Sequence, residues 1–263
     1  MKIQGIVFDW AGTTMDYGCF SPLGAFIQAF ESIGISLSFE EAREPMGMLK
    51  IDHTRAILKM PTVRTKFFDL YNREPNEDDV NDLYEKFESA LFKVLGDYVE
   101  FNPHVIETIN KLKEEGIKIG STTGYTKEMM DMIIPIAKEK GYSPEVCIAS
   151  DELGYGRPYP YMMYENARRL NIYPQKAMVK VGDTVVDMKE GVNAGVWTVG
   201  LILGSSELGL TQEEVASMKK SELELRMEKV RERLVNAGAD YVINDMSELP
   251  KVIEDINTKM NEL

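Results

Sequence analysis

The chain has 263 residues, which suits one large α/β domain or a core domain with a smaller inserted one. Apolar residues make up 44% and charged residues 28%, as in a globular chain with a substantial core, and no apolar run approaches the roughly eighteen residues that a membrane span requires. The formal net charge of −13 argues against a nucleic-acid binder, and an anionic substrate would need a local source of positive charge.

The N-terminus and the cysteines bear on the cellular compartment. The first ten residues lead directly into an apolar strand and lack the pattern of a secretory signal peptide. The two cysteines, Cys19 and Cys147, show no metal-ligand spacing and fit a reducing compartment. We therefore expect a cytoplasmic protein.

Six short apolar runs recur along the chain, and most are separated by stretches with helical character. Runs of this kind are typical of parallel strands that are buried on both faces. The pattern predicts an α/β fold with a doubly wound, mainly parallel sheet of the Rossmann type. The runs are 3–8, 117–121, 146–149, 178–182, 197–203 and 241–243.

The segment between the first two runs has a different character, because it contains no convincing strand between about residues 20 and 98. Ser21 and Pro22 predict the N-cap and first residue of a helix that runs to about Gly34. Asn76 predicts the cap of a second helix, in which apolar residues recur on one face. The segment is therefore predicted to be all-helical.

This helical segment gives the predicted domain organisation. We expect an all-helical cap domain over 20–98, inserted into an α/β core domain made of 1–19 and 99–263. Near the C-terminus, a capping-box pattern at Thr211 predicts one long charged helix over 211–236. The sequence suggests no role for that helix.

Polar residues follow three of the predicted core strands. Asp9 follows the first strand, Thr123 the second and Asp183 the fourth, with Asp187 one helical turn later. Because ligands of open α/β sheets bind at the carboxyl ends of strands, we expect these residues to line one crevice. A carboxylate such as Asp9 can attack phosphorus, and a pair of acidic residues favours a divalent cation. Arg157, in a stiff Gly-Arg-Pro turn, could balance the charge of a phosphoryl group.

Each of these residues also has an ordinary structural interpretation. A lone Asp after a strand is most often a turn residue or a helix cap, and so is a lone Thr such as Thr123. Arg157 alone is usually a solvated loop charge, and Asp183 with Asp187 could be a cap and an exposed helix residue. Their joint occurrence in this order, each at a strand end, favours a catalytic site.

In these residues the sequence resembles the haloacid dehalogenase superfamily. Asp9 matches the nucleophile of its first motif, Thr123 the Ser or Thr of its second and Arg157 the basic residue of its third. Asp183 and Asp187 match the acidic pair of its fourth motif. The resemblance implies that Asp9 and Asp183 bind Mg²⁺, that Asp187 does so directly or through its neighbours, and that Thr123 and Arg157 bind substrate.

Ala11 departs from the pattern of the superfamily's phosphatases. These enzymes carry a second Asp two residues after the nucleophile, where it protonates the leaving oxygen. One interpretation of Ala11 is a pseudoenzyme or an impaired phosphatase, and the other is that the leaving atom is not oxygen. The resemblance implies that Ala11 contributes its backbone carbonyl to the metal, which needs no side chain.

The wider sequence resembles the phosphonatase family, whose members cleave the carbon–phosphorus bond of phosphonoacetaldehyde. The similarity is weakest across about 60–100 and after 215. It implies a homodimer that forms through the cap helices. The matching runs are 9–20, 45–53, 120–126, 156–160, 180–184 and 203–210.

The resemblance assigns Lys50 to an imine with the substrate aldehyde, so that the departing carbon leaves as an enamine. Lys50 must be unprotonated to attack, which requires a pKa below the usual value of about 10.4. His53, three residues later, would share a helical face with Lys50 and shuttle protons. Met46, Cys19 and Tyr125 resemble substrate-pocket residues, although core packing is the ordinary interpretation of Met46 and Cys19.

We therefore expect a Mg²⁺-dependent hydrolase that converts phosphonoacetaldehyde to acetaldehyde and phosphate through a Lys imine and an aspartyl-phosphate. One alternative is a phosphatase or phosphomutase of the same superfamily acting on a small phosphate ester, which Ala11 disfavours because an alkoxide leaving group benefits from an acid. Two others are a non-catalytic binding protein and a phosphorylatable receiver module. The joint presence of Asp9, Lys50 and Asp183 disfavours a non-catalytic binding protein. Lys50 and the long insert disfavour a receiver module.

Overall fold

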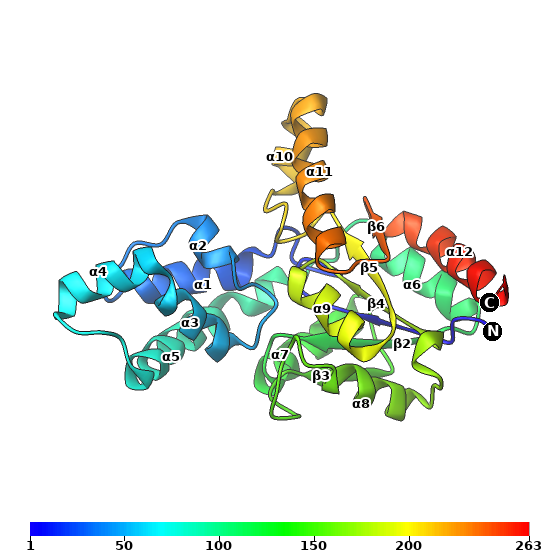
Figure 1. The fold of residues 1–263 in the computed structure, drawn as a ribbon, viewed down its shortest axis with the longest axis horizontal. Coiled ribbons are helices and arrows are strands. Elements are labelled where there is room, and N and C mark those ends of the chain that lie inside the picture. The colour runs from blue at the N-terminus through cyan, green and yellow to red at the C-terminus, as the bar shows by residue number, and fades with distance from the viewer. Residues whose placement is uncertain (263) are drawn as a thin grey trace.

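A parallel six-stranded sheet forms the centre of the core in the computed structural model, which describes residues 1–262 (Figure 1). The strand order is β3-β2-β1-β4-β5-β6, and every adjacent pair is parallel. The order runs outward from β1 and β4, so the switch point of the sheet lies between these two strands. The sheet and its six predicted strands are confirmed as β1 (Gly5–Phe8), β2 (Lys118–Thr123), β3 (Val146–Ala149), β4 (Met178–Gly182), β5 (Trp197–Leu201) and β6 (Tyr241–Ile243).

Helices cover both faces of the sheet, because successive strand residues point to opposite sides. Phe8 of β1 belongs to the apolar cluster of one face and Val7 to the cluster of the other. This is the doubly wound arrangement that the apolar runs predicted. The first face packs against α6 (Val105–Glu114), α7 (Lys127–Glu139) and α12 (Leu249–Glu262), and the second against α8 (Tyr161–Leu170) and α9 (Val185–Ala194).

Five further helices form a separate group beside the sheet, called the cap below (Figure 1). The cap contains no strand within the described chain, as predicted. The two linkers that join it to the core meet where Met15 pairs with Phe101. The chain returns to the core through a short 3₁₀ helix, η1 (Leu95–Tyr98). The five helices are α1 (Phe20–Glu31), α2 (Phe39–Arg43), α3 (Lys50–Lys59), α4 (Pro61–Tyr71) and α5 (Glu77–Val94).

The longest cap helix, α5, begins as predicted. The side chain of Asn76 accepts hydrogen bonds from the backbone N–H groups of Asp78 and Asp79, at 2.8 and 3.2 Å. The apolar face of α5 packs on α1, where the rings of Phe26 and Phe87 stack with centroids 4.0 Å apart. This packing gives the cap an apolar core of its own.

The predicted start of the first cap helix is wrong. α1 begins at Phe20, and its N-cap is Cys19 in the left-handed backbone conformation, so Ser21 lies inside the first turn. The carboxylate of Asp16 accepts the backbone N–H groups of Phe20 and Ser21 at 2.9 and 3.0 Å. Asp16 therefore satisfies the helix end that Ser21 was predicted to cap. The helix also ends earlier than predicted, at Glu31.

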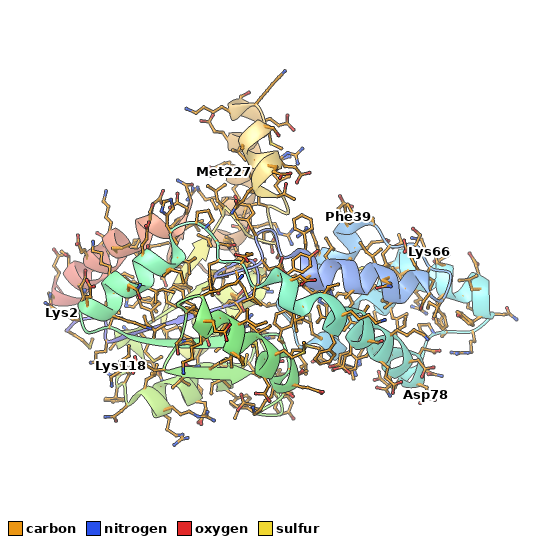
Figure 2. All side chains as sticks on the ribbon, turned by 180° about the vertical axis from the view of Figure 1, so that it is seen from behind. Lys2, Phe39, Lys66, Asp78, Lys118 and Met227 are labelled. Carbon is orange, nitrogen blue, oxygen red and sulfur yellow. The ribbon has the colours of Figure 1, made fainter. Side chains whose placement is uncertain are left out.

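The single long helix predicted over 211–236 is two helices. The predicted capping box at Thr211 opens α10 (Gln212–Ser217), but Met218 and Lys219 are extended, and α11 (Lys220–Asn236) begins after them. α11 projects from the core, and Figure 2 shows Met227 on this projection, seen from behind. Within residues 1–262, none of the helices is both long and apolar enough to span a membrane.

Candidate active site

A small cavity of about 260 Å³ lies where the cap meets the carboxyl ends of the strands. Eight of the eleven predicted site residues line it, and Asp183, Asp187 and His53 do not. The lining residues are Asp9, Ala11, Cys19, Met46, Gly47, Lys50, Thr123, Gly124, Tyr125, Arg157 and Thr184.

The cap reaches the core through a loop that passes very close to it. Gly47 has a φ of 87°, and a Cβ atom at this position would lie 2.5 Å from the hydroxyl of Thr184. Glycine is therefore required here both for the left-handed backbone and for the close approach. This loop carries Met46 to the cavity wall and leads into α3, whose first residue is Lys50.

Three buried carboxylates form an acidic cluster at the core side of the cavity. Asp9, Asp183 and Asp187 each place an oxygen within 4.8 Å of the other two. Asp9 follows β1, Asp183 follows β4 and Asp187 lies in the first turn of α9. Because β1 and β4 are neighbours, the switch point of the sheet brings the three side chains together, as expected from their strand ends.

Asp183 has the least compensated charge of the cluster. Its two oxygens accept hydrogen bonds from the Thr13 hydroxyl and the Ser206 backbone N–H, each at 2.8 Å. No basic side chain of the described residues lies within ion-pair distance of Asp183. Burial and the neighbouring carboxylates Asp9 and Asp187 raise the pKa of Asp183 well above its ordinary value. A divalent cation with oxygen ligands, such as Mg²⁺, fits this site because it would supply the missing positive charge.

Two buried cations hold the other carboxylates. Arg157 donates to Asp9 Oδ1 at 2.7 Å and to Glu190 at 3.0 Å, and its Nη1 lies 3.0 Å from Asp187 Oδ1. Lys180 Nζ lies 2.9 Å from Asp187 Oδ1 and 3.1 Å from Glu190 Oε2. Burial alone would raise the pKa of Asp187, but Arg157 and Lys180 bring that pKa below its ordinary value. Asp187 is therefore held as a carboxylate.

The sequence interpretation missed three members of this network, namely Lys180, Glu190 and Thr122. The Thr122 hydroxyl donates to Glu190 at 3.1 Å and accepts from Lys180 and Arg157 at 2.7 and 2.8 Å. A signal for Lys180 was present, because it lies inside the apolar strand β4 and lysine is almost never fully buried without a partner. Glu190 also follows Asp187 at helical spacing.

Lys50 enters the cavity from the cap and is 4% exposed. Its Nζ lies 5.0 Å from the centroid of the Tyr125 ring, and no carboxylate of the described residues lies within 4.0 Å of it. Burial lowers the pKa of Lys50, and the nearby Cys19 and Asp9 oppose that shift without cancelling it. The environment therefore favours the neutral, nucleophilic amine.

Tyr125 and Cys19 lie beside Lys50 on the cavity wall. The Tyr125 hydroxyl is 2.9 Å from the Ser21 hydroxyl, which donates to Asp16 at 2.7 Å. Burial and nearby carboxylates raise the pKa values of the Tyr125 hydroxyl and the Cys19 thiol well above their ordinary ranges. Both groups therefore keep their protons at neutral pH and remain hydrogen-bond donors.

His53 lies inside the cap rather than in the cavity. Its ring stacks on Phe26 with centroids 3.9 Å apart, and its Nε2 lies 2.9 Å from the carbonyl oxygen of Ala42. Its Nδ1 has no hydrogen-bond partner among the described residues. Burial, and then the charge of Lys50, lower the pKa of His53 well below its ordinary value. The neutral ring thus lies one helical turn behind Lys50.

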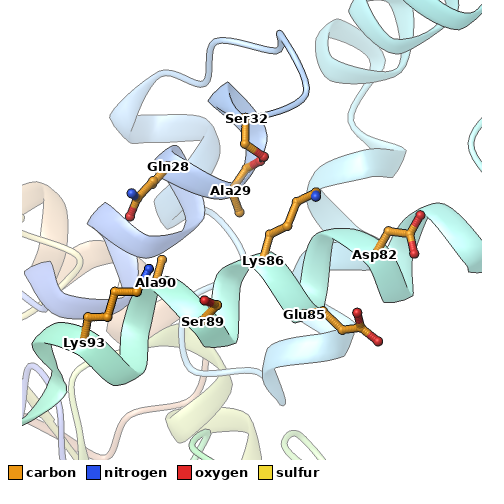
Figure 3. A pocket seen from close by; sticks show the side chains of 9 residues that line it. All are labelled: Gln28, Ala29, Ser32, Asp82, Glu85, Lys86, Ser89, Ala90 and Lys93. Carbon is orange, nitrogen blue, oxygen red and sulfur yellow. The ribbon is translucent and has the colours of Figure 1, made fainter.

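A larger and more open hollow lies on the cap between α1 and α5 (Figure 3). Figure 3 shows Gln28 and Ser32 on one side and Lys86 and Glu85 on the other. The hollow shares no lining residue with the cavity, and its polar side chains form no cluster of buried titratable groups. The cavity at Asp9 is therefore the candidate active site.

Fold and site together define a class of protein. A parallel α/β sheet carries a buried Asp at the end of its first strand, an acidic cluster lies at the switch point, and a helical cap closes over them. The family model described as haloacid dehalogenase-like hydrolase matches residues 3–195. The chain belongs to the haloacid dehalogenase-like hydrolases.

Comparison with individual proteins narrows the similarity within this family. The chain is 55% identical to the phosphonoacetaldehyde hydrolase of Bacillus cytotoxicus over 256 residues, and this aligned region covers 97% of each chain. It is 53% identical to the bifunctional phosphonoacetaldehyde hydrolase/aminoethylphosphonate transaminase of Clostridioides difficile, over 98% of this chain and 41% of that protein. A crystal structure of a phosphonoacetaldehyde hydrolase-like protein from Oleispira antarctica matches with a TM-score of 0.96 at 34% identity, covering 98% and 94% of the two chains. The resemblance to the phosphonatase family is confirmed.

Proposed function

We propose that this chain hydrolyses the carbon–phosphorus bond of phosphonoacetaldehyde to give acetaldehyde and phosphate. The observation that carries the proposal is the presence of Asp9 and Lys50 in one small cavity, with Ala11 where phosphatases of the family have an acid. Among the described residues that line the cavity, Asp9 is the one carboxylic acid, so no second carboxyl is available to protonate an alkoxide. Curated relatives more than 50% identical to the chain carry the name of this activity.

In the core half, we assign Asp9 as the nucleophile that attacks phosphorus. Arg157 and the Thr123 hydroxyl, which both line the cavity, hold the phosphonate oxygens. The residues that would hold Mg²⁺ are Asp9, Asp183 and the backbone carbonyl of Ala11, with Asp187 acting directly or through its ion pairs. When bound, Mg²⁺ offsets the repulsion between the carboxylate and the incoming anion.

In the cap half, Lys50 attacks the aldehyde carbon, and water leaves as the imine forms. The protonated imine is an electron sink, so the carbon leaves phosphorus as an enamine and not as an unstabilised carbanion. Protonation of the enamine carbon and hydrolysis by water release acetaldehyde and restore Lys50. A second water cleaves the aspartyl-phosphate and restores Asp9. Phosphorus thereby exchanges its bond to carbon for a bond to an Asp9 oxygen, and then that bond for one to a water oxygen.

The proton transfers require groups close to Lys50. We propose that His53 shuttles protons to and from Lys50, because its neutral ring is one helical turn away. It acts from behind Lys50, since it does not line the cavity. Tyr125 and Cys19 line the cavity and keep their protons, so they supply hydrogen bonds to the substrate oxygen or the imine. Met46 contributes an apolar wall that limits access of water.

Borohydride trapping tests this proposal. The protein is incubated with phosphonoacetaldehyde and borohydride, and the reduced adduct is mapped by peptide mass spectrometry. We expect the adduct on Lys50 and none in a Lys50→Arg variant, which should still bind Mg²⁺ because the acidic cluster belongs to the core. Normal release of acetaldehyde without any adduct would overturn the imine route. Faster hydrolysis of a small phosphate ester than of phosphonoacetaldehyde would indicate a phosphatase instead.

We also propose that the chain is divided into a cap domain over 20–98 and a core domain of 1–19 and 99–263.

We further propose that the protein is a homodimer. The family resemblance suggests dimerisation through the cap helices. A cluster of exposed tyrosines beside α8 offers a second dimerisation surface, since Tyr155 and Tyr159 have ring centroids 5.2 Å apart. Sedimentation of a Tyr159→Glu variant against a Phe68→Glu variant, which alters an exposed cap position, distinguishes the two surfaces.

A cytoplasmic location belongs to the same proposal. Cys19 and Cys147 are both free thiols, and Cys19 is buried beside Lys50, where oxidation would alter the cavity. A reducing compartment preserves this state. Fractionation of cells that express the protein, with immunodetection in each fraction, tests the location, and recovery outside the cytoplasmic fraction would contradict it.

A further inference from the structure

Arg43, the last residue of α2, connects the cap to both the linker and the core. Its Nη1 donates to the carbonyl oxygens of Gly18 and Ser206, at 2.6 and 3.1 Å. Its guanidinium lies 4.9 Å from the centroid of the Phe20 ring. Gly18 belongs to the first linker and Ser206 to the core loop that follows β5. One cap side chain therefore contacts all three parts of the molecule.

The core loop is shaped to receive this guanidinium. Gly209 has a φ of 64°, and a Cβ atom at this position would lie 3.1 Å from Arg43 Cζ. The backbone N–H of Gly18 donates to the carbonyl of Gly204 at 2.7 Å, which fixes the linker on the same loop. The glycine makes room for the planar guanidinium, and Nη1 of Arg43 donates to the backbone carbonyls of both Gly18 and Ser206.

The same loop holds the acidic residue Asp183. The backbone N–H of Ser206 donates to Asp183 Oδ2 at 2.8 Å, and Ser206 is 3% exposed. Arg43 thus contacts the carbonyl of the residue whose N–H orients Asp183. A change in the position of this loop would change the direction of that hydrogen bond and so the orientation of the carboxylate.

The other oxygen of Asp183 is connected to the second linker. Thr13 donates its hydroxyl to Asp183 Oδ1 at 2.8 Å, and the carbonyl of Thr13 accepts from the side chain of Asn102 at 3.1 Å. Asn102 is buried and follows Phe101, which pairs with the first linker at Met15. Both oxygens of Asp183 are therefore held by groups that contact the segments supporting the cap.

We propose that Arg43 is a positioning residue that couples closure of the cap to the orientation of Asp183. The contact between Arg43 and Ser206 forms only when the cap rests on the core, because the two residues belong to different parts. Closure then fixes the backbone of Ser206 through its carbonyl, and the N–H of the same residue fixes Asp183. By reciprocity, a metal that prefers the fixed carboxylate stabilises the closed cap by the same factor. An effect of Arg43 on the rate of hydrolysis rests on the proposed function, whereas its effect on metal binding does not.

Titration of Mg²⁺ into substrate-free protein by calorimetry tests the coupling directly. We expect Arg43→Ala to weaken Mg²⁺ binding about five- to twentyfold, within the range of typical coupling energies. Arg43→Lys should show an intermediate effect, because it keeps the charge but loses the planar guanidinium that packs at Gly209 and Phe20. Arg64→Ala is the matched control, since Arg64 is an exposed cap arginine that pairs with Glu74, and its Mg²⁺ affinity should stay within twofold of wild type.

Two further measurements separate positioning from a general loss of stability. Millimolar guanidinium chloride should restore part of the Mg²⁺ affinity of Arg43→Ala, and Mg²⁺ should protect the linkers from proteolysis less in this variant than in wild type. If Arg43→Ala does not fold, the same titrations on Arg43→Lys decide the question. Wild-type Mg²⁺ affinity and wild-type protection in the folded variants would overturn the proposal. Failure of the wild type to release acetaldehyde would refute the proposed function but leave the metal titrations to decide this inference.

Discussion

The core half and the cap half of the cavity treat buried charge in opposite ways. In the core half, Arg157 and Lys180 lie 2.7–3.1 Å from carboxylate oxygens, and each cation pairs with more than one carboxylate. In the cap half, Lys50 is equally buried but has no carboxylate within ion-pair distance among the described residues. Pairing preserves a charge in the interior, whereas isolation favours the neutral form.

This difference matches the two kinds of chemistry that the proposed reaction needs. Transfer of a phosphoryl group requires fixed charges that do not reorganise during the reaction. Imine formation requires an amine that has lost its proton. If the two halves work independently, substitutions in one half should leave the partial reaction of the other half intact.

Asp9→Ala should have the largest effect and tests this independence. Removal of the nucleophile should lower phosphate release by about 10⁴-fold or more, because no other carboxylic acid of the described residues lines the cavity. Borohydride should still trap the aldehyde on Lys50 in this variant. The measurements are a phosphate assay and mass spectrometry of the reduced adduct. If the Asp9→Ala variant loses both phosphate release and trapping of the aldehyde, the two halves are coupled.

Glu190→Gln should break the charge balance of the core half alone. Arg157 and Lys180 would lose a shared buried counter-ion, and Arg157 would lose one of the contacts that orient it toward Asp9. We expect kcat to fall about 10–100-fold with a smaller change in KM, since Arg157 would be less precisely oriented in the transition state. Glu165→Gln is the control, because Glu165 forms exposed pairs on α8 and its loss should change kcat less than twofold. Equal effects of the two substitutions would refute the assignment.

The pH dependence of imine trapping should report the cap half alone. Below the pKa of Lys50, the neutral amine falls about tenfold for each pH unit, so the trapping rate in Asp9→Ala should fall equally. Because burial lowers the pKa of Lys50, the rate should reach its plateau below pH 10.4, the approximate value for a free lysine. A plateau at or above that pH would show that Lys50 is not held toward its neutral form.

The sheet and the core half were predictable because their signals are local. Strands buried on both faces read as apolar runs, and a carboxylate at the end of such a run, as at Asp9 or Asp183, is visible in the sequence. The break in the helix at Met218 and Lys219 gave no local signal, because both residues have good helical propensity. The residue that caps the N-terminus of α1 could not be predicted either. Asp16 accepts hydrogen bonds from residues four and five positions ahead, whereas Ser21 fits the usual pattern of an N-cap.

The position of His53 shows a second limit of sequence reasoning. A spacing of three residues places His53 and Lys50 on neighbouring parts of one helix, as predicted. The spacing does not determine which side chain faces the cavity, because this depends on how α3 packs on α1. The structure directs His53 toward Phe26 of α1 and Lys50 toward the cavity. A contact between two helices therefore decides what the sequence left open.

The effect of Lys50→Met on folding stability should be the smallest change among these measurements, and it should be favourable. Burial lowers the pKa of Lys50 in the folded chain below its value in an unfolded chain, which is about 10.4. Between the folded and unfolded pKa values the unfolded chain binds more protons, so wild-type stability rises with pH across that window. Below the unfolded pKa, burial of the Lys50 amine therefore lowers the free energy of unfolding, by about 1.4 kcal/mol for each unit by which the pKa is lowered. Methionine has no ionisable group and removes this destabilisation.

The advantage of Lys50→Met should therefore be largest at or below the folded pKa and should shrink as the pH approaches about 10.4. Urea unfolding at pH 7 and pH 9.5 measures it. Lys59→Met is the matched control, since Lys59 is exposed on the same helix and its replacement should change the free energy of unfolding by less than about 0.5 kcal/mol at either pH. A Lys50→Met variant that gains no stability, or whose gain increases with pH, would mean that the cap half does not favour a neutral amine, and the contrast with the paired cations of the core half would no longer hold.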